Sequence, residues 1–159
     1  MATAAIAFSG KTDVTEISGA DFGKITVTDL ALMTKTQAAL LTPDQISNLS
    51  DKGLAAITPV LKYVAADTVA AISPKLVSGL PVKNLLPVQF TGMTAEQIGS
   101  LTTTQINALA KTQLAGLAED QIQSLNIAGV NVKNLGDLFN KLSTAQVAKL
   151  TSAQIGDLS

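Results

Sequence analysis

The side chains best suited to chemistry are scarce in this sequence. It contains no Cys, His, Trp or Arg among 159 residues, and every basic side chain is a Lys. Without Cys and His, the sequence lacks a thiolate nucleophile, the commonest general base and the usual zinc ligands. Ser9 and Ser18 therefore have no imidazole to activate them. Without Arg there is no bidentate clamp for a carboxylate or a phosphate.

Carboxylates are the remaining candidates for acid–base or metal chemistry. Glu119 and Asp120 are adjacent, but nothing in the sequence selects them as a glycosidase pair, and acidic residues are common where a helix starts. Asp13, Glu16 and Asp21 lack the spacing and the terminal Glu of a calcium loop. No Walker or Rossmann glycine pattern occurs. The sequence predicts no catalytic, cofactor or metal site, and we expect a protein that is not an enzyme.

Glutamine forms the most prominent polar feature, a column at regular spacing: Gln37, Gln45, Gln97, Gln105, Gln113, Gln121, Gln146 and Gln154. The column could be a ladder of amides that binds a partner or a neighbouring subunit. We favour the other interpretation, in which the amides cap helices and form hydrogen bonds inside the protein. Gln113 and Gln121 lack a hydroxyl residue three positions earlier, so we expect them to pair across repeats or to contact a partner.

The elements that position these residues come from an eight-residue repeat, the octad. Met93, Leu101, Leu109, Leu117 and Leu125 stand eight apart. The first position is a large aliphatic residue, the second usually Thr or Ser, the fifth Gln and the sixth Ile or Leu. The frame returns at residue 142 and extends back to residue 17, with one slip and more variation.

The octad predicts short helices, each started afresh. Thr-x-x-Gln, as at Thr42/Gln45 and Thr102/Gln105, is a capping box in which hydroxyl and amide satisfy the first backbone N–H groups. Pro follows the Thr or Ser directly at three places, where the first helical residue tolerates it: Pro43, Pro59 and Pro74. We therefore predict an all-α solenoid of short re-capped helices.

Two other architectures compete with this prediction. A single long helix or coiled coil is disfavoured because two apolar residues per octad give a spacing of about 4.0, which drifts around a helix. A β-solenoid is the main alternative, but the octads lack strand alternation and are rich in Ala, Gln and Leu. Near the N-terminus, Ala5–Phe8 and Lys24–Thr28 could be extended.

The predicted organisation has two parts. Residues 1–16 form an N-terminal arm outside the repeat, which could be extended, and residues 17–159 form the octad array. Interruptions are expected near 86–92 and 127–141. Because interruptions of solenoids often map to a binding face, Phe90 and Phe139 are candidate contacts, although plugging the core is the interpretation that we favour.

Composition limits the partners. The net charge is −1, and no basic stripe suggests nucleic-acid binding. No stretch approaches the ~18 apolar residues of a membrane span, so membrane insertion is not expected. The first ten residues lack the features of a secretory signal.

The octads Thr-x-x-Gln-Ile/Val-x-x-Leu, over most of 33–158, resemble repetitive segments of large bacterial secreted and cell-surface proteins. The resemblance implies a structural role outside the cell and nothing catalytic. A second likeness, of Leu41–Ile46 followed by Pro59–Leu61, is to repeats of transcription-activator-like effectors. We set it aside because the period is eight and the family's basic helical stripe is missing.

We therefore expect a secreted or cell-surface structural protein, either a head-to-tail filament or a segment of a large adhesin. Its partners would be further copies of itself or another surface protein. The array reaches Leu158 without a polar capping repeat, which would leave apolar side chains open to stacking. The alternative is a monomeric solenoid scaffold that binds a protein or peptide.

Overall fold

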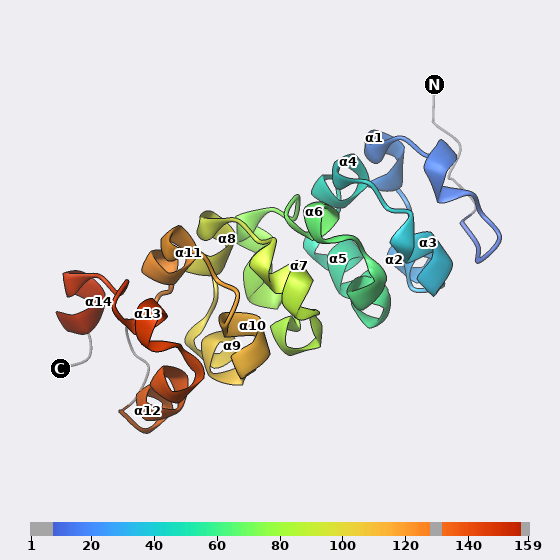
Figure 1. Ribbon diagram of the computed structural model, residues 1–159. Coiled ribbons are helices and arrows are strands. Elements are labelled where there is room, and N and C mark those ends of the chain that lie inside the picture. The colour runs from blue at the N-terminus through green and yellow to red at the C-terminus, as the bar shows by residue number, and fades with distance from the viewer. Residues whose placement is uncertain (1–7, 128–131, 157–159) are drawn as a thin grey trace. The chain divides into compact units, whose positions relative to one another are not determined.

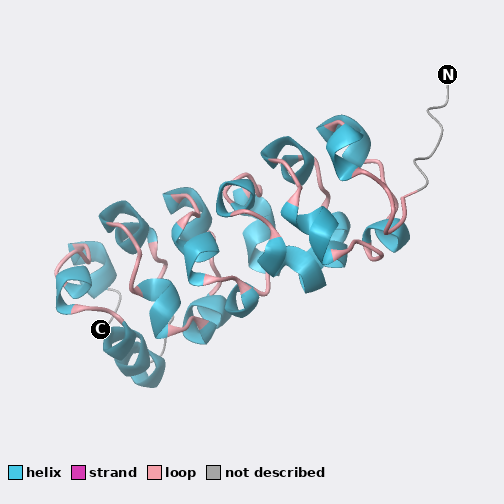
Figure 2. Ribbon diagram, turned by 45° about the vertical axis from the view of Figure 1, so that its right-hand side comes forward, coloured by secondary structure: helices cyan, strands magenta, loops and turns pink. Residues whose placement is uncertain are grey.

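The computed structural model describes residues 8–127 and 132–156, and in these ranges it contains helices, turns and no strand (Figure 2). The predicted all-α class is confirmed, and the β alternative receives no support. The chain divides into two compact units, residues 1–80 and 81–159, where the sequence suggested one continuous array from residue 17. Each unit is described separately.

The first unit consists of short α-helices and 3-10 helices. In chain order they are η1 (Val14–Glu16), α1 (Gly19–Phe22), α2 (Val27–Leu30), α3 (Lys35–Ala39), α4 (Pro43–Ser47), α5 (Asp51–Ile57), η2 (Thr58–Tyr63), α6 (Ala66–Val69) and η3 (Pro74–Gly79).

The second unit has the same character. It contains η4 (Val82–Asn84), α7 (Pro87–Thr91), α8 (Ala95–Gly99), α9 (Thr103–Ala108), α10 (Lys111–Leu114), α11 (Glu119–Ser124), α12 (Val132–Lys141), α13 (Thr144–Val147) and α14 (Ser152–Gly156). The longest of these, α12, lies in the predicted interruption at 127–141.

Helix starts follow the capping chemistry expected from the octad. Thr42 is extended at the N-cap of α4, its hydroxyl accepts from the Gln45 N–H, and Pro43 is the first helical residue. Pro74 likewise opens η3. Pro59 is the second residue of η2 rather than the first, since Thr58 already has helical geometry.

Helices stack on helices three octads away within each unit (Figure 1). In the first unit α1 packs against α4 and α2 against α5; in the second, α7 packs against α10 and α8 against α11. The first residues of each pair are 24 positions apart, as with Gly19 and Pro43. The octad therefore limits the length of each helix, and stacked neighbours are separated by three octads along the sequence.

The core consists of the aliphatic first and sixth octad positions. Leu41 and Ile46 in one octad, and Leu101 and Ile106 in another, are all buried. Burying such a side chain is worth roughly 1.5–3 kcal/mol, and this burial stabilises helices that are too short to persist alone.

Two expectations about local structure are wrong. Lys24–Thr28 is not extended, because Thr26 caps α2, which begins at Val27. Residues 86–92 do not break the array either. Leu85, Gln89 and Phe90 occupy the first, fifth and sixth octad positions, and α7 forms there with Pro87 as its first residue. Phe in place of Ile, and Leu86 in place of Thr, hide this octad in the sequence.

The expected N-terminal arm is only partly described. Residues 1–7 lie outside the described ranges. Val14–Glu16 forms the 3-10 helix η1, so this part of the arm is not extended. None of the described helices combines the length and the apolar character needed to cross a membrane.

Candidate functional site

The glutamine column is a set of buried side chains. Gln37, Gln45, Gln89, Gln97, Gln105, Gln113, Gln121, Gln146 and Gln154 are each no more than 8% exposed. A buried amide needs partners for one carbonyl oxygen and two N–H groups, because leaving them without partners costs about 1–3 kcal/mol per group.

The carbonyl end of each amide caps its own helix. Its Oε1 accepts from the backbone N–H of the N-cap residue, three positions earlier, at 2.8–3.0 Å. This bond forms even where the N-cap has no hydroxyl, as with Ala110 and Gln113. The amide half of the capping box is therefore independent of the Thr or Ser half.

The nitrogen end reaches backbone carbonyls far back in the chain. Gln45 Nε2 donates to the Val14 and Ile17 oxygens at 2.6 and 2.8 Å. Gln113 Nε2 donates to the Val82 and Leu85 oxygens at 2.7 and 3.0 Å. Each amide therefore joins the start of its own helix to two carbonyls of an earlier turn.

Four further glutamines follow the same geometry. Their amides join Gln37 to Ser9 and Thr12, Gln121 to Thr91 and Met93, Gln146 to Leu114 and Leu117, and Gln154 to Ile122 and Leu125. In all six cases the acceptors lie 25–32 residues before the donor. They include carbonyls at helix C-termini, which lack an intrahelical partner. We call this set of bonds the amide ladder.

The ladder assigns a role to two predicted interaction residues. Gln113 and Gln121 pair with distant octads, as expected, but Gln37, Gln45, Gln146 and Gln154 do the same. All three hydrogen-bonding groups of the Gln113 amide are engaged. Neither amide is available to an external partner in this structure.

The other predicted contacts lie in different settings. Phe90 is fully buried at the sixth octad position, as a core plug would be. Phe139, in α12, is half-buried. Leu158 lies outside the described residues.

The N-terminal arm takes part in the ladder. The Ser9, Thr12 and Val14 carbonyls accept from Gln37 and Gln45, so this portion of the arm is bound by its own chain. In the sequence, Ser9 and Gln37 are 28 residues apart. This spacing can be recognised as a contact only after the stacking of helices three octads apart is known.

Some octads of the first unit carry another polar residue at the fifth position. Asp21 and Asp29 accept from the hydroxyls of their own N-cap residues, Ser18 and Thr26, at 3.0 and 2.8 Å. Thr68 instead uses a hydroxyl, which donates to the Leu41 oxygen at 3.1 Å and so replaces a glutamine with a shorter donor.

One charged cluster has no signal in the repeat pattern. Lys35 Nζ and Lys62 Nζ lie 5.4 and 5.2 Å from the centre of the Tyr63 ring, within cation–π range. Desolvation alone would raise the pKa of Tyr63. Hydrogen bonds and positive charge from Lys35 and Lys62 outweigh it and hold that pKa below its ordinary value.

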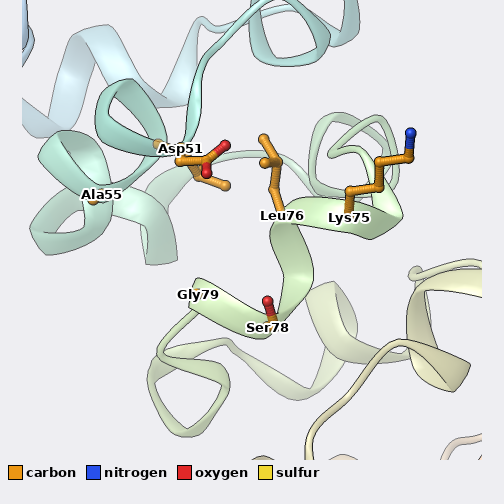
Figure 3. Close-up of a pocket in the computed structure, with 7 residues that line it drawn as sticks. Asp51, Ala55, Lys75, Leu76, Ser78 and Gly79 are labelled. Atoms are coloured by element: carbon orange, nitrogen blue, oxygen red, sulfur yellow. The ribbon is translucent and has the colours of Figure 1, made fainter.

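A small hollow and a larger, more open one lie at the surface of the first unit. One, of about 130 Å³, lies between α5 and η3. Figure 3 shows Asp51 and Leu76 on facing sides of it, with the Lys75 side chain directed away. Pockets for drug-sized ligands usually occupy ≈ 300–1,000 Å³. A more open hollow of about 520 Å³ lies between residues 10–14 and the α3 region. In the described parts of the chain, no three potential metal ligands cluster.

Comparison with known proteins gives no match to this chain among family models, curated proteins or solved structures.

Proposed function

We propose that this chain is a structural solenoid of the bacterial cell exterior, in which three octads make one coil and glutamine amides tie each coil to the one before it. The amide ladder is the observation that carries the proposal. Its side chains are buried, and its amides join the start of one helix to backbone three to four octads earlier.

The energetics suit a mechanical role. A net contribution of about 1 kcal/mol per hydrogen bond gives a modest gain for each amide. The larger effect is on register, because a slip of one residue would leave a buried donor or acceptor without a partner. A chain built in this way holds its coils in fixed alignment, which a spacer or rod requires.

The extracellular location rests on the resemblance of the octads to repetitive segments of bacterial surface proteins. An antibody against the chain should label intact cells of the source bacterium before permeabilisation. Labelling that appears only after permeabilisation would contradict the location while leaving the structural role open.

Two forms of the structural role are distinguishable. The chain can act as a stiff segment of a surface protein, which is the form we favour, or copies can associate head to tail into a filament. Light scattering coupled to size-exclusion chromatography, with negative-stain microscopy, separates them. A mass near 16.3 kDa at all concentrations supports the segment, and growing fibres establish the filament.

A monomeric scaffold that binds a protein partner is the second candidate. Exposed apolar side chains at the start of α7 favour it, since Leu86 is 47% and Val88 62% exposed. The scaffold requires a specific partner that the double variant Leu86→Ser/Val88→Ser loses. Capture of the same proteins by wild type and variant would argue against it.

A further inference from the structure

The fifth octad position is acidic in the two octads that form α1 and α2. We propose that these two octads are a built-in end cap of the stack, and that Asp21 and Asp29 close their outer side to another coil. The inference rests on the proposed solenoid stacking, but it concerns which face can stack.

Both carboxylates occupy the position at which the ladder residues sit. Asp21 and Asp29 are the third residues of their helices, as Gln45 is of α4. Each carboxylate accepts a hydrogen bond from the hydroxyl of its own N-cap residue, Ser18 or Thr26. A carboxylate has no N–H group, so neither residue can donate to the carbonyls of another coil.

The ladder runs in one direction, because each of its glutamines donates from the start of its own helix to earlier backbone. Gln45 of α4 donates to the Val14 and Ile17 carbonyls on either side of η1. The Asp44 carboxylate also joins α4 to earlier backbone, because its Oδ2 accepts from Gly19 N at 2.9 Å. The inner side of α1 is thus occupied by α4, and the side toward which a fifth-position amide would reach carries carboxylates.

A coil placed on that side would meet unfavourable chemistry. Its carbonyl oxygens would face negatively charged oxygens in place of amide N–H groups. The Asp21 side chain is also 45% exposed and paired with Lys24 at 2.8 Å. Covering it would take the half-exposed Asp21–Lys24 pair out of water, and the desolvation penalty of two charges can exceed their mutual attraction.

Acceptors for such a contact exist elsewhere in the chain. Val147 ends α13 and Leu150 lies three residues beyond it, as Leu114 ends α10 and Leu117 lies three residues beyond it. The Leu114 and Leu117 carbonyls accept from Gln146. Among the described residues, no side chain donates to Val147 or Leu150. A second copy with an amide at position 21 would therefore find one complementary pair of carbonyls, because a single amide such as Gln146 uses both members of a pair.

The test converts the cap into a stacking face. Glutamine at the third helical position keeps the capping bond, so Asp21→Gln/Asp29→Gln should fold with an unchanged helical circular dichroism spectrum. We expect the wild type to remain at 16.3 kDa by light scattering and the double variant to at least double its average mass as concentration rises.

The control is Asp51→Gln/Asp67→Gln, which removes the same number of negative charges at exposed positions outside the fifth-position column. It should stay monomeric. Three outcomes would each overturn the cap. The control could associate to the same extent, the double variant could stay monomeric, or wild-type fibres could grow from the α1 and α2 face. Failure of the structural role itself would appear separately, as ladder variants without any loss of stability.

Discussion

The side-chain nitrogen of Gln113 donates to the backbone oxygen of Val82, 31 residues earlier, at 2.7 Å. This bond and its equivalents explain why an eight-residue repeat uses glutamine where glutamate would cap a helix equally well. Only the amide combines an acceptor for its own N-cap with donors for a distant helix end. The capping box and the stacking contact share one residue.

Replacing a ladder glutamine should destabilise the protein well beyond the loss of a surface contact. Gln121→Leu leaves the Ala118 N–H and the Thr91 and Met93 carbonyls without their side-chain partner. We expect a loss of about 2–4 kcal/mol in the free energy of unfolding, measured by urea denaturation. Gln123→Leu, two residues away and exposed, should change it by less than about 0.5 kcal/mol. Equal losses would contradict a structural role for the ladder.

Stacking also depends on close approach at glycine. A Cβ on Gly19 would collide with the Asp44 carboxylate and would lie 2.7 Å from the Asp44 backbone oxygen. Gly19→Ala should therefore destabilise the first unit by about 1–3 kcal/mol, because α4 would have to move.

Gly79→Ala is the matched control for that change. Nothing lies within 4 Å of a Cβ at Gly79, so Ala should be neutral or stabilise by up to about 1 kcal/mol through lower chain entropy. Thermal melts of both variants provide the comparison. A tolerated Gly19→Ala would show that α1 and α4 do not pack at the distance described.

Thr68 tests whether a hydroxyl can substitute for the amide. Thr68→Val keeps the shape but removes the hydroxyl that donates to the Leu41 carbonyl, and we expect a loss of about 0.5–1.5 kcal/mol. Thr112→Val, at an exposed position in α10, should have little effect. The hypothesis fails if the two variants unfold at the same denaturant concentration.

Much of the helical structure follows from the sequence. Thr42 and Gln45 are three apart, so the capping box can be recognised locally, and the all-α class follows from repeating it. The partner of Gln45 cannot be found in this way, because Val14 and Ile17 become its neighbours only after the chain has turned through three octads. Local spacing determines where helices begin. Which helices stack depends on how successive helices are turned relative to one another, and local spacing does not determine this.

Two segments differ from expectation for reasons that lie mainly at their own helix starts. Val27 and Thr28 have strand-favouring side chains, but the Thr26 cap and the burial of Leu30 outweigh that preference. Leu86 conceals an octad because it lacks the hydroxyl by which the others are recognised, although Gln89 still caps the helix through its amide.

The Tyr63 cluster predicts a measurable titration. Tyr63 is the only Tyr and the chain has no Trp, so the ultraviolet absorbance of the phenolate reports one site. Since Lys35 and Lys62 hold its pKa below the ordinary value, the folded protein should ionise Tyr63 at lower pH than the urea-unfolded chain does. Lys35→Met/Lys62→Met should raise the folded midpoint toward the unfolded one, whereas Lys52→Met should leave it unchanged.

The sign of the stability change follows by linkage. The unfolded chain holds the phenolic proton more tightly, so stability should rise as pH increases from the folded pKa of Tyr63 to the unfolded value, and the contribution should be absent below the folded pKa. Urea denaturation across this alkaline range, compared between wild type and Lys35→Met/Lys62→Met, isolates the contribution of the cluster. An identical pH dependence in both proteins would mean that the two lysines do not stabilise the phenolate.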